Sequence, residues 1–268
     1  MTQDSVPATA LEKTVPYPVK YSFCTFVTNL NEYQEMRESA ASVGFIEDVE
    51  FLFLDNSQEN QMDAYDGINH FLTCAKGQYV IICHQDILFK FDNRETLDNC
   101  IKDLTAKDPR WAILGNAGIG LDYKSNVRMS DPTGDNISRG DFPVKVMSLD
   151  ENFLVINAQY RLSVASDIGG FHMYGPELCL NAYDMGYSCY AVDFHLLHKS
   201  AGKVNDYFFE VLERFKRSRN RRKKTVLYQS MITRFILGGG YIGNMLNKMP
   251  YILNIYKSIK RRLSNKSL

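Results

Sequence analysis

The chain has 268 residues, of which 45% are hydrophobic and 12% are aromatic. This length fits one large domain, or a domain of about 200 residues with an appendage, and the composition excludes disorder over the whole chain. The formal net charge is zero, but residues 1–206 carry 16 Lys+Arg and 29 Asp+Glu, whereas residues 207–268 carry 15 and 2. Such a split indicates two parts with different partners.

The six cysteines form no C-x-x-C pair, and several lie in apolar runs. We therefore expect buried thiols in a reducing compartment rather than disulfides. The first ten residues, M-T-Q-D-S-V-P-A-T-A, lack the basic and apolar regions of a secretory signal. No stretch of about 18 uninterrupted apolar residues occurs, so a membrane-spanning helix is not expected. These features predict a cytoplasmic protein.

Short apolar runs alternate with helical segments over the first 117 residues. After a polar, flexible arm at 1–19, we expect strands at 21–28, 49–56, 77–84 and 111–117 and helices at about 32–43, 61–75 and 94–106. Short buried strands that alternate with helices predict parallel βαβ units. The expected fold is therefore an open α/β sheet, mixed but mostly parallel and flanked by helices.

The pattern changes after Gly118. Residues 122–143 are rich in Asp, Ser, Asn, Gly and Pro and predict a long loop. Further strands are expected at 143–149, 153–157 and 187–194, and a helix at about 176–186. The expected α/β domain covers residues 20–206, and a basic, amphipathic helical extension covers 207–268.

Three of the expected strands end in polar side chains, namely T-N-L-N-E at 28–32, D-N-S at 55–57 and H-Q-D at 84–86. The carboxyl ends of parallel strands meet at one edge of an open sheet, where ligands bind, so these side chains should converge on a crevice. Neither G-x-G-x-x-G after the first strand nor G-x-x-x-x-G-K-[ST] occurs, which leaves dinucleotide and P-loop sites unsupported. A phosphate-bearing ligand would then need a divalent metal held by carboxylates, and Asp86 is well placed for this.

The ordered motifs resemble GT-A-fold (Rossmann-like) glycosyltransferases of the family 2-like group. The likeness to their nucleotide-sugar half rests on T-N-L-N-E, F-L-D-N-S and I-C-H-Q-D, with H-Q-D where that group carries its D-x-D metal motif. The second half resembles the glycosyltransferase-like family named after a streptomycin-biosynthesis protein. That likeness rests on S-L-D-E-N-F-L-V-I, G-G-F-H-M-Y-G-P-E-L-C-L-N-A, G-Y-S-C-Y-A-V-D and H-K-S-A-G, and the whole match runs from about residue 21 to 205.

This resemblance implies a metal-assisted transferase that moves a sugar from a nucleotide-sugar, usually UDP-linked, to a glycan or lipid-linked acceptor. The implied donor-binding residues are Thr28, Glu32, Asp55, Ser57, Gln85 and Asp86. The implied ligands of Mn²⁺ or Mg²⁺ are Asp86, His84 and His198, with His84 in place of the usual first carboxylate. The implied catalytic base is Glu177, where inverting relatives keep an Asp, and His172, Tyr174 and Asp150 would lie near the sugar or the acceptor.

These residues also have ordinary structural explanations. Asp55 could cap the next helix, Glu177 is a first-turn acid that suits the helix dipole, and His195 competes with His198 as a ligand. A sugar nucleotidyltransferase is a weaker alternative, because the Gly-rich, basic first loop that it needs is missing. The non-enzymatic alternative is a membrane-associated nucleotide-sugar-binding or scaffold protein with a degenerate site.

The densest charge run is R-F-K-R-S-R-N-R-R-K-K at 214–224. Its single aromatic residue, Phe215, does not provide the base-stacking surface of a nucleic-acid-binding protein, so no nucleic acid is expected. The segments that follow interleave apolar and basic residues, as interfacial segments do. Each basic residue near an anionic membrane contributes on the order of 1 kcal/mol. We therefore expect peripheral attachment to the inner face of a membrane.

Overall fold

The computed structural model describes residues 10, 16–200, 202, 204–223, 225–229, 231, 234–238, 240–249, 251 and 255. The chain forms two compact units, Met1–Val211 and Leu212–Leu268. Most of the expected arm at 1–19 and the last part of the expected extension lie outside the described residues.

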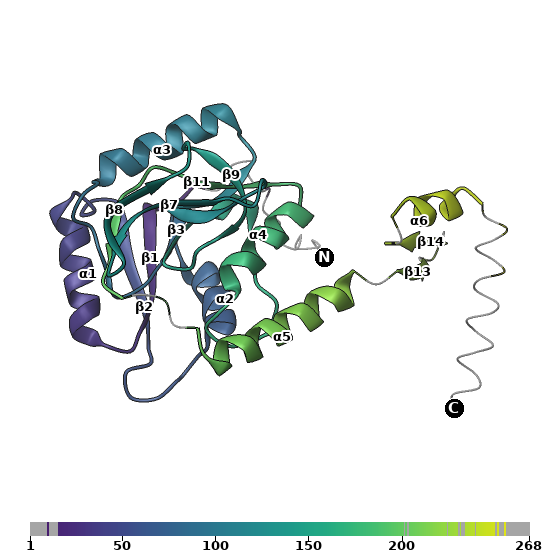
Figure 1. The fold of residues 1–268 in the computed structure, drawn as a ribbon, viewed down its shortest axis with the longest axis horizontal. Coiled ribbons are helices and arrows are strands. Elements are labelled where there is room, and N and C mark those ends of the chain that lie inside the picture. Colours follow the sequence, from purple (N-terminus) through teal and green to yellow (C-terminus); the bar gives the residue numbers. More distant parts are fainter. Residues whose placement is uncertain are drawn as a thin grey trace, which may run out of the picture. The chain divides into compact units, whose positions relative to one another are not determined.

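The first unit is an α/β fold in which helices cover both faces of a mixed sheet (Figure 1). Its elements in chain order are β1 Val19–Val27, α1 Leu30–Ser42, β2 Val49–Asp55, α2 Ala64–Cys74, β3 Gly77–Cys83, β4 Ile87–Leu88, α3 Arg94–Lys107, β5 Trp111–Gly115, β6 Ala117–Gly120, β7 Ser125–Asp131, β8 Gly134–Arg139, β9 Val144–Leu149, β10 Phe153–Asn157, the short 3₁₀ helix η1 Ala158–Tyr160, α4 Tyr174–Asp184, β11 Ser188–Ala191 and β12 Leu196–His198. The strands and helices expected before residue 117 are all present, within a few residues.

The sheet order is β2-β1-β3-β10-β5-β11-β9-β6-β7-β12-β4, with β8 paired to β7. The parallel pairs expected at the start are confirmed, since β1 pairs in parallel with β2 and β3. Among the pairings described in this sheet, however, four are parallel and seven antiparallel, so the expectation of a mostly parallel sheet is wrong. Two antiparallel pairings belong to β10, which follows β9 after a three-residue turn without a crossover helix and enters between β3 and β5. The other five belong to the second half of the sheet, where β6 pairs antiparallel with β7 and β9, β7 with β8, β9 with β11 and β12 with β4.

The long loop expected at 122–143 is also wrong, because β7 and β8 form an antiparallel hairpin there. Asp131 shapes its turn by accepting a hydrogen bond from the Thr133 backbone N–H at 2.8 Å. Strand β8 is largely exposed, so it needs no apolar run, and its polar sequence resembles that of a loop.

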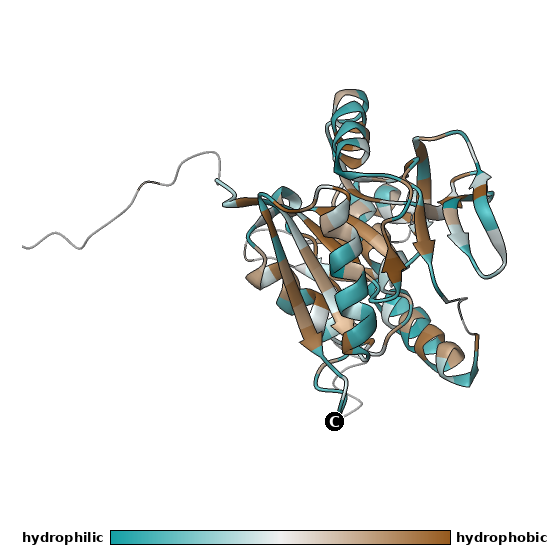
Figure 2. Ribbon diagram, turned by 90° about the vertical axis from the view of Figure 1, so that its left-hand side faces the viewer, coloured by the Kyte–Doolittle hydropathy of each residue, from teal (hydrophilic) through white to brown (hydrophobic). Residues whose placement is uncertain are grey.

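Alternate residues of the central strands point to opposite faces of the sheet. On one face Phe23 stacks on Phe51 with ring centroids 4.9 Å apart and meets Phe45 edge-on at 5.2 Å, in a core shared with α1 and α3. Helices α2 and α4 lie on the opposite side, where Phe26 packs on Phe71 of α2. Figure 2 shows largely hydrophobic strands and helices that carry both hydrophilic and hydrophobic residues. Each fully buried large side chain contributes roughly 1.5–3 kcal/mol.

Helix α5, Asp206–Arg222, begins where the basic extension was expected to begin. The second unit then contains β13 Val226–Gln229 and β14 Arg234–Leu237, an antiparallel hairpin, and α6 Gly240–Asn247. The side chain of Asn247 bonds both the N–H and the C=O of Ile236, at 2.6 and 2.9 Å, and so joins α6 to β14. The expectation of helix throughout the extension is therefore wrong over the hairpin.

Within the described residues, every helix is too short or too polar to cross a membrane. All six cysteines lie in the described part of the chain and are free thiols, four of them buried.

Candidate metal centre and adjoining cavity

The H-Q-D motif forms the turn between β3 and β4. The backbone N–H of His84 donates to the carbonyl of Asn152 at 3.0 Å, which holds this turn against the turn that precedes β10. Strand β4 pairs antiparallel with β12, and Ile87 is in register with His198. The end of β12 therefore lies beside the H-Q-D turn.

This pairing brings together the three residues that the sequence named as metal ligands. One ligand atom from each of His84, Asp86 and His198 lies within 4.8 Å of the others. Asp86 Oδ1 is 3.4 Å from His198 Nε2, and Asp86 Oδ2 accepts a hydrogen bond from Ser200 Oγ at 2.6 Å. The two imidazole rings have centroids 5.5 Å apart.

The environment fixes the charge of two of these groups. Burial raises the pKa of Asp86, but the hydrogen bonds from His198 and Ser200 outweigh it and hold that pKa well below its usual range. Burial lowers the pKa of His198, and the hydrogen bond and charge of Asp86 overcome this and raise it above its ordinary value. Asp86 is therefore ionised, and His198 carries a proton over a wider pH range than a free histidine.

His84 has the opposite tendency. Burial, and then the charge of His198, lower its pKa, so its ring is neutral at neutral pH. Its Nε2 lies 3.1 Å from the Tyr174 hydroxyl, which donates its own proton to the carbonyl of Glu151 at 3.2 Å. Tyr174 thus accepts from Nε2–H, and Nδ1 of His84 keeps a lone pair for a ligand.

A divalent transition ion fits this donor set. Two imidazole nitrogens and one ionised carboxylate suit ions that accept both nitrogen and oxygen ligands, such as Mn²⁺, Fe²⁺ or Zn²⁺. Mg²⁺ prefers a near-octahedral shell of oxygen ligands, to which histidine does not contribute. Of the two ions expected from the sequence, the residues present favour Mn²⁺.

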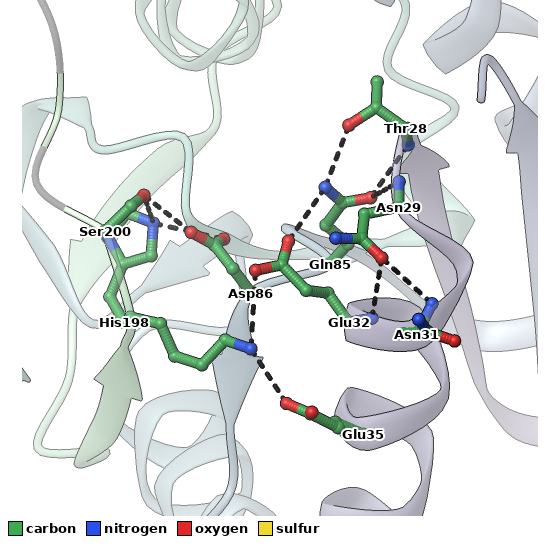
Figure 3. Close-up of polar contacts among 10 residues, drawn as sticks. Thr28, Asn29, Asn31, Glu32, Glu35, Gln85, Asp86, His198 and Ser200 are labelled. Atoms are coloured by element: carbon green, nitrogen blue, oxygen red, sulfur yellow. Dashed lines mark hydrogen bonds and ion pairs between the residues drawn. The ribbon is translucent and has the colours of Figure 1, made fainter. Parts of the chain in front are cut away.

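Gln85 joins the ends of two strands and a helix (Figure 3). Its side-chain oxygen accepts hydrogen bonds from the backbone N–H groups of Thr28 and Asn29 at 2.8 and 2.9 Å. Its amide nitrogen donates to Thr28 Oγ1 at 2.9 Å and to Glu32 Oε2 at 3.2 Å. The amide is fully used in these bonds, so Gln85 positions its neighbours.

Lys199 connects the end of β12 with α1. Its ammonium lies 3.4 Å from Glu32 Oε1 and 2.8 Å from Glu35 Oε2, and its backbone N–H donates to the Asp86 carbonyl at 3.0 Å. The same residue therefore touches both the metal-ligand cluster and the Gln85 network.

The two histidines of this cluster, His84 and His198, also line a cavity of about 450 Å³. The lining residues are His84, Met129, Asp131, Leu149, Asp150, Glu151, Asn152, Phe171, His172, Met173, Pro176, His198, Gly202, Val204 and Phe208. The His172 ring is 5.4 Å from Phe208 and 5.8 Å from Tyr207, in an aromatic wall. Cavities of this size and mixed lining are typical of small-molecule sites.

The turn D-E-N at 150–152 supplies the polar part of the cavity wall. Asp150 Oδ1 accepts from the backbone N–H and the side-chain N–H of Asn152 at 3.0 and 2.8 Å. Asn152 is 1% exposed, and its Oδ1 has no hydrogen-bond partner among the residues that the structure describes. Glu151 accepts from the Gly175 N–H at 3.1 Å.

The comparison with curated proteins identifies a family. A protein of Fuscovulum blasticum described as "ATP synthase subunits region ORF 6" is 32% identical over 228 residues, which cover 82% of this chain and 92% of that protein. The chain belongs to the family of this protein. The relative's description names a region and an open reading frame and states no activity. No family model matches the chain.

Solved structures give weaker likenesses. One is the crystal structure of GalNAc-T7 with UDP, GalNAc and Mn²⁺, at 9% identity and a TM-score of 0.44, which covers 73% of this chain and 48% of that one. Another is S. aureus TarS 1–349, at 13% identity and a TM-score of 0.45, which covers 75% of this chain and 73% of that one. At TM-scores below 0.5 these likenesses carry no argument about chemistry.

Asp55 and Ser57 lie apart from the cavity lining. They follow β2, where Asp55 is in register with Val27 at the end of β1. Asp55 Oδ1 accepts from the Ser57 N–H at 2.9 Å, and the hydrogen bonds from Ser57 lower the pKa of Asp55. Thr28 and Glu32 lie on the same edge through β1 and α1, and their contacts with Gln85 and Lys199 tie them to the cluster of His84, Asp86 and His198.

The structure does not bring Glu177 to the cavity. Its side chain is fully buried in α4 and accepts from Asn181 Nδ2 at 3.3 Å, and Pro176 is the α4 residue that lines the cavity. Tyr174 is likewise buried behind the lining, where it holds His84. Glu151 and Asn152 also line the cavity. The sequence favours Asp150 and Glu151 as turn residues, with a role near the acceptor as the alternative, and it does not single out Asn152.

Proposed function

We propose that this protein is a metal-assisted glycosyltransferase that moves a sugar from a nucleotide-sugar, UDP-linked, to a glycan or lipid-linked acceptor. One observation carries the proposal: the ligand cluster His84, Asp86 and His198 adjoins a cavity lined by carboxylates and aromatic side chains. The ordered sequence motifs, with H-Q-D in the D-x-D position, support the same reaction.

The residues of the cluster suit a diphosphate-binding metal centre. A bound cation would offset the negative charge that develops on the leaving nucleoside diphosphate. Neutral His84 and ionised Asp86 present ligand atoms without first losing a proton, and His198 must lose one. The negative charge of ionised Asp86 would offset part of the positive charge of a bound cation before a diphosphate binds.

We assign the donor nucleoside to the strand ends next to the cluster. Asp55 is ionised and partly exposed, so it can accept a hydrogen bond from a base N–H, with Ser57 beside it. Gln85 fixes the backbone after β1, which holds Thr28 and the first turn of α1 with Glu32 in one geometry. This preorganisation lowers the ordering cost of binding.

We assign the sugar and the acceptor to the cavity. Asp150 is exposed at its wall and can accept hydrogen bonds from hydroxyl groups, while His172 lies within the aromatic wall. Burial lowers the pKa of His172, so its neutral ring can both donate and accept. Tyr174 contributes indirectly by orienting His84.

Thermal shift with UDP, GDP and other nucleoside diphosphates, each with and without Mn²⁺, tests the proposal. We expect stabilisation by one diphosphate only when Mn²⁺ is present. Asp86→Ala should remove the metal-dependent part, whereas the matched control Asp122→Ala, on an exposed loop, should retain it. Failure of every diphosphate to stabilise the protein would instead support a scaffold with a degenerate site.

We further propose that the second unit attaches the protein to the cytoplasmic, inner face of an anionic membrane. Helix α5 carries the basic run, and the α6 residues Tyr241 and Ile242 are 84% and 65% exposed. Val226, Tyr228 and Leu237 of the hairpin are about half exposed as well. Exposed apolar side chains next to basic residues are typical of interfacial segments, and such attachment suits a lipid-linked acceptor.

A further inference from the structure

Three carboxylates line the cavity, and two of them each accept two hydrogen bonds from a single neighbouring turn residue. Asp131 Oδ1 accepts from both the backbone N–H and the hydroxyl of Thr133, which shapes the β7–β8 turn. Asp150 Oδ1 accepts both hydrogen bonds from Asn152, and its side chain is exposed. The third carboxylate, Glu151, is partly buried in the wall.

Glu151 lies against the N-terminus of α4. The residue before this helix, Met173, has a φ of 68° and makes no side-chain capping bond, and Glu151 instead accepts from the Gly175 N–H. A Cβ at position 175 would lie 2.5 Å from the Leu149 carbonyl oxygen and 3.1 Å from Glu151 Cγ. The glycine therefore lets a carboxyl group from another element approach the helix end.

The same position makes this carboxyl group a good proton acceptor. Burial raises the pKa of Glu151 to about 8, the Gly175 N–H opposes the rise, and the charge of Asp150 adds to it. The other titratable groups around it are Tyr174 on α4 and the cavity histidines His84, His172 and His198. A general base is most effective when its pKa lies near the working pH.

We propose that Glu151 is the catalytic base of this cavity and takes the proton of the acceptor hydroxyl. This inference rests on the proposed function. As the acceptor oxygen bonds to the anomeric carbon, the bond from that carbon to the diphosphate oxygen breaks, and its electron pair leaves with the nucleoside diphosphate. The acceptor proton passes to the Glu151 carboxylate. The neighbouring residue Asn152 also lines the cavity, and its Oδ1 has no partner within the described part of the chain.

Glu151→Gln tests this role, because the amide oxygen can still accept from the Gly175 N–H while the group no longer titrates. The assay is hydrolysis of UDP- and GDP-sugars, with water as the acceptor, between pH 5.5 and 9, at Mn²⁺ concentrations that saturate the protein at every pH. The wild-type rate should rise with pH and level off above about pH 8. The Glu151→Gln variant should be about 10²- to 10⁴-fold slower, and its rate should no longer rise with pH. The control Asp122→Asn should behave as wild type.

Two further measurements separate the possible failures. In metal-free protein labelled with ¹³C at glutamate carboxyls, the wild type should show one signal that titrates near pH 8 and is missing from Glu151→Gln. Stabilisation by Mn²⁺ with UDP or GDP should be equal in both proteins, since Glu151 is outside the ligand cluster.

The outcomes are distinct. A wild type that neither responds to any nucleotide nor hydrolyses any donor refutes the proposed function and this inference with it. A wild type that does both, beside a Glu151→Gln variant with unchanged rate and pH profile, overturns only the role of Glu151. If the ¹³C carboxyl signal that is missing from Glu151→Gln titrates near pH 4.5, this result also overturns the role of Glu151 as the base. A variant that loses stability but keeps its rate identifies Glu151 as a helix cap alone.

Discussion

The carboxylate of Asp86 lies 3.4 Å from the imidazole Nε2 of His198, two residues that the pairing of β4 with β12 brings together from distant parts of the chain. Without a metal the two groups attract each other by opposite charge, because Asp86 stays ionised and the raised pKa of His198 favours its protonated form. A metal ion that binds here must therefore displace a proton from His198.

Mn²⁺ affinity should accordingly depend on pH. Because the pKa of His198 is raised, its protonated form competes with the metal below that pKa, and affinity should fall by up to about tenfold for each pH unit. His84 adds little competition near neutral pH, since its pKa is lowered. Titration calorimetry with Mn²⁺ at pH 6, 7 and 8 measures this.

Two variants control the experiment. His198→Ala should abolish both binding and its pH dependence, and His70→Ala, on the exposed side of α2, should leave both unchanged. Equal affinity at all three pH values would contradict the assignment of His198 as a ligand.

Gln85 should contribute to stability through its four hydrogen bonds. In Gln85→Ala, the backbone N–H groups of Thr28 and Asn29 lose the oxygen that accepts from both. Because these groups are partly solvated, we expect a loss of about 1–2 kcal/mol in the free energy of unfolding. Urea denaturation measures the loss. Gln34→Ala, on the exposed face of α1, is the matched control and should cost less than about 0.5 kcal/mol.

The local parts of this fold are predictable from sequence. The apolar runs of β1, β2 and β3 and the caps after them are set by neighbouring residues, although β2, at the edge of the sheet, is only partly buried. The positions of Thr28, Asp55 and Asp86 at one edge therefore follow directly. The approach of His198 to Asp86 depends on β4, a strand of two residues that no hydrophobic pattern reveals. Only the resemblance to GT-A glycosyltransferases pointed to His198.

The cavity wall is less predictable because it depends on distant pairing. Glu151 gains its burial only when the turn before β10 meets the N-terminus of α4. Glu177 has the sequence position of a first-turn acid, but the α4 face that carries it turns towards the sheet. The orientation of α4 decides whether Glu151 or Glu177 borders the cavity. The helical pattern alone does not specify that orientation.

Gly175 should be intolerant of even one added carbon. In Gly175→Ala, the new Cβ would meet the Leu149 carbonyl oxygen at 2.5 Å, and backbone atoms cannot give way cheaply. Overpacking of this kind costs about 1–3 kcal/mol. Gly202→Ala is the control, because no atom of another described residue lies within 4 Å of its added Cβ. Thermal denaturation of both variants checks the prediction, and equal melting temperatures would contradict it.

Membrane attachment should depend on the basic residues of α5 and of the turn after it, where Lys223 lies. We expect the triple variant Lys216→Glu, Arg217→Glu and Lys223→Glu to lose on the order of 3 kcal/mol of binding, since each basic residue near an anionic surface contributes about 1 kcal/mol. That loss corresponds to roughly 100-fold weaker partitioning. Co-sedimentation with vesicles of phosphatidylcholine containing phosphatidylserine measures it.

The matched control places three reversals of the same sign on the first unit, at the exposed residues Lys76, Lys90 and Lys102. Both triple variants have the same net charge, so a general electrostatic effect would weaken them equally. Site-specific attachment weakens only the α5 variant, and added salt should release the wild type because screening shortens the range of the attraction. Wild-type protein that stays in solution with these vesicles at low salt would rule out an electrostatic membrane anchor.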